Sequence, residues 1–308
     1  TRRSSDLART FAKAPGGAPA NVAVGVARLG AGAGLIAAVG ADPFGDYLAS
    51  LGAAEGVDTA GVVRIEDVRT SLAFVAARSD GAKDITFYRN PGADMCLTPE
   101  HLPAGTLEAA GAFHFGSISR IDPGPRAATD EARRRAAATG ALVSYDPNWR
   151  PTLWPDPDAA RERILEGFPG THVAKVSAEE WAFVTGEARF AAGAARLHEA
   201  GADLVVRSEG ADGASFATRS AEGHVDAPAV NVVDALGAGD ACMACLIVDL
   251  LAAGRAGRRP GELDADDLRR VVGRAVAAGS LACTRLGAIP ALPTDDELEA
   301  FLAGKGAG

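Results

Sequence analysis

The stretch that decides the fold is Val232-Val-Asp-Ala-Leu-Gly-Ala-Gly-Asp240, in the last third of a 308-residue chain. Apolar residues then recur at helical spacing, at Met243, Leu246, Ile247, Leu250 and Leu251. This pattern predicts a strand, a glycine-rich turn and a helix. Glycines let successive backbone N–H groups point into one concavity, and a helix N-terminus adds a positive dipole end. The stretch therefore predicts an anion site.

Asp240 stands at the start of the predicted helix and has two interpretations. It can take a proton from an attacking hydroxyl while the neighbouring N–H groups hold the charge of a phosphoryl group in transfer. It can instead cap the helix, with the glycines forming only a tight turn. The turn alone does not decide between them.

Other phosphate and metal motifs are absent from the sequence. There is no Gly-x4-Gly-Lys-Ser/Thr and no Gly-x-Gly-x-x-Gly, which disfavours P-loop enzymes and the standard dinucleotide fold. The His-Arg-Asp and Asp-Phe-Gly elements of protein kinases and the His-Glu-x-x-His zinc motif are also missing.

A second glycine turn, Gly16-Gly17-Ala-Pro-Ala-Asn21, opens another predicted helix near the start of the chain. Pro19 fits the first helical turn, and Gly17 lets a ligand approach the backbone. Asn21 offers both a donor and an acceptor, which suits sugar hydroxyls. A plain helix start is the alternative.

Short apolar runs alternate with Ala-rich helical stretches over most of the chain. The predicted strands are 35–39, 112–115, 142–145, 171–176 and 203–206. The predicted helices are 19–29, 125–139, 157–167, 178–185 and 190–200. This alternation predicts an α/β fold, with a mostly parallel central sheet covered by helices on both faces.

The region from residue 62 to residue 88 breaks this alternation. It predicts strands at 62–65, 70–77 and 84–88, the last two joined by the turn Ser79-Asp80-Gly81. We expect a small inserted β lid at 62–90 and a core made of 1–61 and 91–308. An edge extension of the main sheet is the alternative.

Composition excludes several classes of protein. A net charge of −9 disfavours a general nucleic-acid or anionic-membrane surface, and no run of eighteen apolar residues predicts a membrane span. Four sparse cysteines indicate a reducing, cytoplasmic setting. The pair Cys242-x-x-Cys245 lacks the flanking residues of redox motifs, so we interpret it as two small apolar helix residues.

Taken together, the two glycine turns resemble the two signatures of the ribokinase-like (PfkB) carbohydrate kinases. The matching positions are Gly16-Gly17-x-x-x-Asn21-x-Ala23-x5-Leu29-Gly30 and Asp234-x-x-Gly237-Ala238-Gly239-Asp240. The resemblance covers nearly the whole chain and is strongest to fructokinases. It is carried further by 39–45, 88–94, 113–119, 144–150, 175–180 and 287–293. It implies a ribokinase-like three-layer sandwich with a small β lid.

The resemblance also implies a reaction, in which a sugar hydroxyl attacks the γ-phosphoryl group of ATP; D-fructose giving fructose 6-phosphate is the expected case. Asp240 would be the base, and the N–H groups of Gly237, Ala238 and Gly239 the anion hole. Arg150 would clamp the transferring phosphate, with a surface ion pair as the alternative. The implied sugar-binding residues are Gly16, Gly17, Asn21, Arg89, Asp94 and Asn148.

The cofactors implied are ATP and Mg²⁺, with K⁺ beside the anion hole at Asp234. Glu180 matches the acidic residue of the family's Asn-x-x-Glu element, which orders water around Mg²⁺. An exposed helix residue is the alternative for Glu180. The implied nucleotide contacts are Lys175, Ser177, Ser208, Gly210, Gly213, Val276 and Gly279.

One departure concerns the start of the chain. The family begins with a strand that ends in a sugar-binding Asp, and residues 1–13 are too polar and charged to predict one. Either that strand lies outside this chain or the protein lacks it. The alternatives that stay open are a kinase for 2-keto-3-deoxygluconate or a nucleoside, and a weakly active ligand-binding regulatory relative. We expect the lid sheet to serve also as a homodimer interface.

Overall fold

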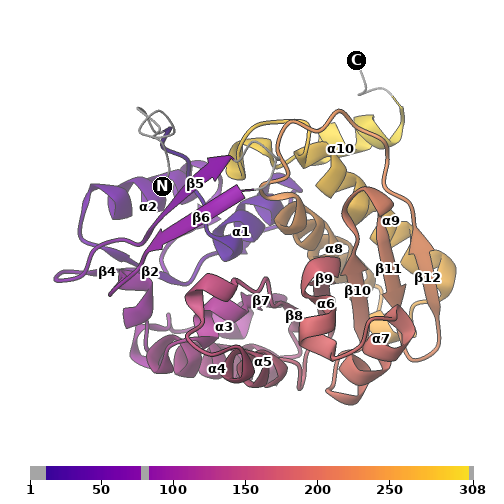
Figure 1. Ribbon diagram of the computed structural model, residues 1–308, viewed down its shortest axis with the longest axis horizontal. Coiled ribbons are helices and arrows are strands. Elements are labelled where there is room, and N and C mark those ends of the chain that lie inside the picture. The colour runs from indigo at the N-terminus through magenta and orange to yellow at the C-terminus, as the bar shows by residue number, and fades with distance from the viewer. Residues whose placement is uncertain (1–11, 78–82, 305–308) are drawn as a thin grey trace, which may run out of the picture.

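The computed structural model describes residues 12–77 and 83–304. Its centre is a six-stranded sheet in the order β12-β11-β10-β9-β8-β7 (Figure 1). Four neighbouring strands are parallel: β7 (Ala112–Gly116), β8 (Leu142–Asp146), β9 (Val173–Ser177) and β10 (Leu204–Ser208). Two antiparallel strands complete one edge: β11 (Ala214–Ala217) and β12 (Glu222–Val225). The predicted α/β fold with a mostly parallel sheet is confirmed.

Helices cover both faces of this sheet, which makes the predicted three layers. One face carries α1 (Ala18–Arg28), α8 (Ala238–Arg255) and α9 (Ala265–Ala282). The other carries α4 (Pro123–Ala138), α5 (Pro157–Leu165), α6 (Ala178–Thr185) and α7 (Phe190–Glu199). Away from the sheet lie α2 (Pro43–Ala54), the short α3 (Thr106–Ala109) and α10 (Asp295–Leu302). Within the described residues, no helix has the length and apolarity needed to cross a membrane.

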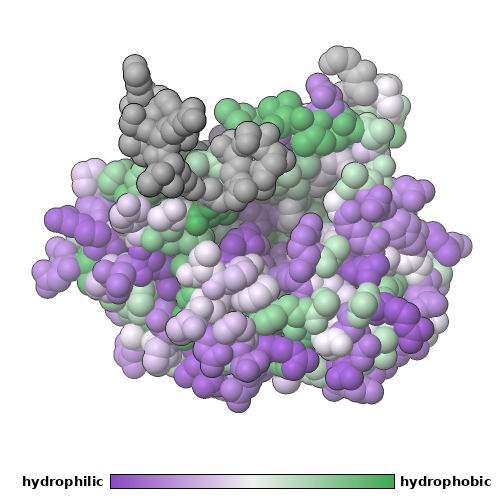
Figure 2. Space-filling view, viewed as in Figure 1, coloured by the Kyte–Doolittle hydropathy of each residue, from purple (hydrophilic) through white to green (hydrophobic). Residues whose placement is uncertain are grey.

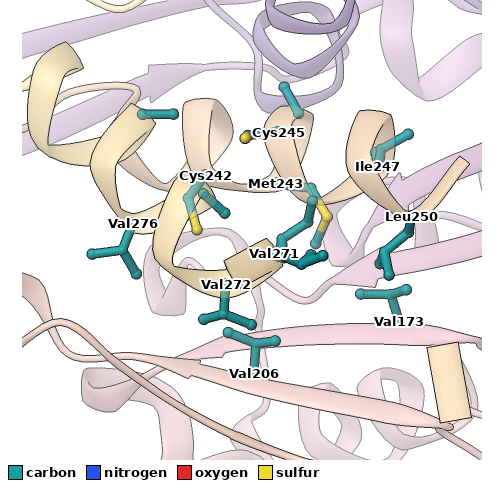
Figure 3. Close-up of a cluster of buried hydrophobic side chains, with 14 of the residues drawn as sticks. Val173, Val206, Cys242, Met243, Cys245, Ile247, Leu250, Val271, Val272 and Val276 are labelled. Carbon is teal, nitrogen blue, oxygen red and sulfur yellow. The ribbon is translucent and has the colours of Figure 1, made fainter. Parts of the chain in front are cut away.

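The largest core lies between the sheet and helices α8 and α9 (Figure 3). Val173 of β9 and Val272 of α9 belong to it, together with both cysteines of α8. Burial raises the pKa of the Cys242 thiol to about 11 and also raises that of Cys245. Because a redox motif works as a thiolate, these thiols are poor candidates for that chemistry. They pack as small apolar side chains, as the sequence indicated.

The first third of the chain forms three two-stranded sheets beside the main one. In parallel pairs, β1 (Ala33–Gly34) joins β3 (Val57–Asp58), and β2 (Ala37–Gly40) joins β4 (Val62–Ile65). The antiparallel pair is β5 (Leu72–Ala77) with β6 (Lys83–Tyr88). The strands predicted between 62 and 88 are therefore present, and β4 pairs with a strand of the predicted core. The turn predicted at 79–81 and residues 1–11, most of the polar segment in which no first strand is predicted, fall outside the described residues.

The strand predicted at Val232-Val233 is wrong. These valines lie in coil, where the N–H groups of Val233 and Asp234 both donate to the Cys283 carbonyl oxygen, at 2.8 and 3.1 Å. Two N–H groups that donate to a single carbonyl oxygen do not form the hydrogen-bond ladder of a β-sheet. The prediction was based on β-branched residues alone, which do not by themselves determine a strand. The side chain of Val232 is 62% exposed. Figure 2 shows hydrophobic side chains along the upper edge of the molecule, where Figure 1 shows the C-terminal segments.

Candidate active site

The glycine-rich turn forms the beginning of α8. Gly237 is left-handed, with φ of +86°, and a Cβ there would lie 3.0 Å from the Cα of Ala288, so the position needs glycine. Ala238 and Gly239 form the first helical turn, whose N–H groups have no acceptor one turn back in the helix. The Ala238 N–H makes a turn bond to Ala235 at 3.3 Å. The predicted N–H groups therefore gather at one positive helix end.

Asp240 lies at this turn beside Asn21 of α1. The Asn21 Nδ2 donates to the Asp240 Oδ2 at 2.7 Å, and both side chains are buried. Burial raises the pKa of Asp240 to about 6, although the Asn21 bond and the charges of Lys175 and Arg150 act to lower it. A carboxylate with this pKa is deprotonated at neutral pH and basic enough to accept a proton.

The amide of Asn21 has a second feature. Its Oδ1 is buried and has no hydrogen-bond partner within the described structure. A buried acceptor without a partner is unfavourable, so a ligand donor such as a sugar hydroxyl fits the site. The helix starts at Gly17, which has φ of +107°, and both Gly16 and Gly17 are exposed, with nothing within 4 Å of an added Cβ. The predicted second turn therefore presents open backbone next to Asn21.

A buried ion pair lies behind the turn. The Lys175 Nζ of β9 is 2.6 Å from the Asp146 Oδ2 of β8, and both side chains are buried. A Cβ on Gly239 would lie 3.4 Å from the Lys175 Nζ, so the ammonium sits directly against the turn. Sequence reasoning assigned Lys175 to the nucleotide but missed Asp146. The position of Asp146 could have indicated its role, because Asp146 ends the strand that neighbours the strand of Lys175 and points to the same face of the sheet.

Glu180 is buried, which excludes the exposed-helix interpretation. Its two carboxylate oxygens accept the N–H groups of Ser177 at 2.9 Å and Trp149 at 2.7 Å. Burial and the charge of Asp146 raise the pKa of Glu180. The bond to Trp149 fixes the loop that follows β8.

That loop carries two predicted site residues. Asn148 has φ of +46°, a left-handed conformation that asparagine tolerates better than most residues. Arg150 is exposed, and its guanidinium donates to the backbone carbonyl oxygens of Asn148 and Trp149 at 3.4 and 3.2 Å. The positive charge of Arg150 lowers the pKa of Asp240, so Arg150 belongs to the electrostatic environment of the glycine-rich turn.

Arg89 and Asp94, both predicted to bind sugar, pair with each other at the base of the β5–β6 hairpin. The Arg89 Nε donates to Asp94 at 2.5 Å, and its Nη2 donates to Asp122 at 2.9 Å. Ser71 also donates to Asp94. These bonds join the ends of the hairpin to the body of the protein.

The predicted nucleotide residues fall into two groups. Ser177 and Ser208 are register partners at the carboxyl ends of β9 and β10. Gly210 and Gly213 form the turn that follows, and a Cβ on Gly213 would lie 2.0 Å from the Val225 carbonyl oxygen.

The second group lies on α9. Gly279 lets this helix approach α8, because its Cβ would lie 3.0 Å from the Ala238 carbonyl oxygen. Val276 is buried in the core cluster. Gly279 is therefore at the predicted anion hole, whereas Val276 packs inside the protein.

Asp234 links the turn to the segment after α9. Its Oδ1 accepts the Leu236 N–H and its Oδ2 accepts the Gly287 N–H, both at 3.0 Å. In the part of the chain that the structure describes, no three His, Cys, Asp or Glu side chains gather closely enough to ligate a metal directly.

A buried base, a helix N-terminus rich in N–H groups and a buried cation can together support transfer of a phosphoryl group to a hydroxyl. Known proteins agree with this chemistry. Residues 1–295 match the pfkB family carbohydrate kinase model. The probable fructokinase-4 of Arabidopsis thaliana is 41% identical over 298 residues, which is 96% of this chain and 89% of the relative.

Two solved structures are also similar. A fructokinase with bound ATP from Xylella fastidiosa has a TM-score of 0.89 and 36% identity, covering 97% of this chain and 94% of its own. A fructokinase double mutant from Vibrio cholerae O395, in fructose, ADP and potassium ion bound form, has a TM-score of 0.85 and 32% identity, covering 94% and 91%. Fold, site geometry and sequence agree, and the chain belongs to the pfkB family of carbohydrate kinases.

Proposed function

We propose that this protein transfers the γ-phosphoryl group of ATP to the 6-hydroxyl of D-fructose. The observation that carries the proposal is the buried Asn21–Asp240 pair at the glycine-rich start of α8. The fructokinase names of the relatives support the choice of sugar.

In this reaction Asp240 takes the proton of the attacking hydroxyl as the new oxygen–phosphorus bond forms. The bond from the γ-phosphorus to the oxygen it shares with the β-phosphate breaks, and ADP leaves. Asn21 holds one oxygen of Asp240, so the other accepts the proton. The N–H groups of Gly237, Ala238 and Gly239 stabilise the charge on the transferring group, and Arg150 adds a cation to the same site.

The charges of the site fit a divalent cation. Asp146, Glu180 and Asp240 are buried carboxyl groups. Asp146 raises the pKa of the other two, and the buried cation Lys175 lowers the pKa of both. Mg²⁺ would neutralise phosphate charge during transfer. Because no direct ligand set gathers among the described residues, the ion would keep most of its waters, one of them held by Glu180. Asp234 is the candidate for K⁺, since it joins the two segments that flank the anion hole.

The test is turnover of a sugar panel by the purified full chain with ATP and Mg²⁺. The panel contains fructose, glucose, 2-keto-3-deoxygluconate, ribose and a nucleoside, with products identified by ³¹P NMR. We expect fructose 6-phosphate to be the main product. Turnover of another member alone would favour the related-kinase alternative, and sugar binding without any transfer would favour a regulatory relative.

Asp240→Asn is expected to lose turnover by a factor on the order of 10² or more. The matched control is Asp249→Asn, which removes a carboxylate on the same helix, paired with Arg274 and outside the turn. The control should keep its turnover. Equal rates for Asp240→Asn and the wild type would exclude Asp240 as the base.

We also infer a homodimer through the β5–β6 hairpin, in a cytoplasmic protein. A two-stranded sheet is marginally stable alone, yet this one exposes Val75 by 43% and Tyr88 by 65%. Tyr88 packs edge-on against Phe74, with ring centroids 5.2 Å apart. Sedimentation should give a dimer for the wild type and a monomer for Tyr88→Asp, and a monomeric wild type would exclude this interface. Fluorescence imaging of the tagged full-length protein tests the location.

A further inference from the structure

Alternation along three parallel strands places a polar layer under α8. His114, Ser144 and Lys175 point to the same face of the sheet as the α8 core, as does Asp146 at the end of β8. His114 Nδ1 and Ser144 Oγ lie 3.0 Å apart, and burial lowers the pKa of His114 to about 4. The histidine is therefore neutral near pH 7, and the charged members of the layer are Asp146 and Lys175.

The Asp146–Lys175 pair is not needed to join its two strands. Strands β8 and β9 already form a parallel ladder, and a buried ion pair rarely stabilises a fold more than apolar side chains of the same volume. Burial disfavours the charged Lys175, yet Asp146, with smaller contributions from Cys242 and Glu180, outweighs this effect and raises the pKa of Lys175. The carboxylate therefore keeps an ammonium charged at a buried position that touches Gly239.

The same pair acts on Asp240. The negative charge of Asp146 raises the pKa of Asp240, and the positive charge of Lys175 lowers it. The groups that face Asp240 from the neighbouring elements are Asn21 of α1, Asp146 of β8, Arg150 after β8 and Lys175 of β9.

We infer that Asp146 is a positioning residue for phosphoryl transfer, holding the Lys175 ammonium behind the glycine-rich turn so that this ammonium adds positive charge to the anion hole. This inference rests on the proposed kinase function. Asp146 acts through its neighbours and is not itself a group that contacts the reacting atoms.

The first test is the pH dependence of kcat/KM for fructose in Asp146→Asn. Without Asp146 the buried Lys175 holds its proton less tightly, so kcat/KM should fall at a lower pH on the basic side of the profile than in the wild type. The matched control is Asp130→Asn, because Asp130 pairs with buried Arg120 at 2.6 Å and does not act on Lys175. It removes one of the two carboxylates beside a buried cation, yet the basic side of its profile should coincide with that of the wild type. Equal basic limbs in Asp146→Asn and the wild type would overturn the inference.

The second test does not need turnover. The pKa of Lys175 is measured by ¹³C NMR of the lysine side-chain carbons in the wild type and in Asp146→Asn, with Lys175→Met for assignment. It should be lower in Asp146→Asn, and identical values would overturn the inference. If fructose is not phosphorylated by the wild type, the proposed function fails, while this titration still decides the role of Asp146.

A third variant covers the case in which Asp146→Asn does not fold. The double substitution Asp146→Asn with Lys175→Met removes both charges and leaves no buried ion unpaired. Its kcat should fall on the order of tenfold because the ammonium behind the anion hole is lost, with KM for fructose within about twofold of the wild type. A wild-type kcat in a folded double variant would show that the pair is only structural.

Discussion

Replacing Asp240 with asparagine is expected to stabilise the folded protein, although it removes the proposed base. Burial raises the pKa of Asp240 from its ordinary 3.8 to about 6. At about 1.4 kcal/mol for each pKa unit, the ionised carboxylate destabilises the fold by about 3 kcal/mol at neutral pH. Asparagine has nearly the same shape, carries no charge and keeps an oxygen that can accept the Asn21 bond.

The sign of this effect depends on pH. The folded carboxyl binds its proton more tightly than the unfolded one, so the destabilisation is complete above about pH 6 and disappears below about pH 3.8. Asp240→Asn should therefore gain about 3 kcal/mol at pH 7.5 and about half of that at pH 5.

The assay is urea unfolding of the wild type and the variant at both pH values. Asp42→Asn is the control of opposite sign, because bonds from Thr70, Gly45 and Phe44 outweigh burial and lower the pKa of Asp42. That variant should be destabilised at pH 7.5, by an amount that shrinks as the pH falls. A less stable Asp240→Asn at pH 7.5, or a gain that is equal at both pH values, would refute the reasoning.

Three further predictions concern the same turn. The wild-type kcat/KM for fructose should be half-maximal near pH 6, as the pKa of Asp240 requires, and about tenfold lower at pH 5 than at pH 7; a flat steady-state profile would contradict this. Asn21→Leu removes a bond that lowers this pKa, so the acid limb should move above pH 6 in the same assay. Gly237→Ala should lose about 1–3 kcal/mol in urea unfolding, because alanine strains a φ of +86° and meets Ala288. Its control, Gly254→Ala in the last turn of α8, where an added Cβ meets nothing within 4 Å, should gain up to about 1 kcal/mol.

Local patterns predicted most of the fold. The β–α alternation predicted the parallel strands of the central sheet, and helix α6 at 178–185 was predicted to the residue. The antiparallel strands β11 and β12 were missed because each has only four residues and Ala214–Ala217 is buried throughout, without polar alternation. The strand at Val232-Val233 was wrongly predicted because the N–H groups of Val233 and Asp234 both donate to a single carbonyl oxygen, that of the distant Cys283.

The site, like the fold, could be predicted only where the residues that form it are neighbours in the sequence. Glycine turns and helix starts are local, so Gly17, Gly237 and Asp240 could be found from neighbouring residues alone. The role of Asp146 depends on a partner 29 positions away on another strand, and the pairing of Arg89 with Asp122 depends on how the hairpin meets the body. Such contacts exist only after the strands are aligned.

The Asn21–Asp240 bond joins residues that are 219 positions apart. During synthesis, α1 leaves the ribosome long before α8, so a nascent chain that stops before α8 contains Asn21 but lacks the proposed base. An incomplete chain can then bind neither sugar nor nucleotide productively, and it cannot consume ATP. Contacts this far apart also slow folding, because a large loop has to close before they form. Catalytic competence should therefore be the last property that this polypeptide acquires, and its onset would report completion of the fold.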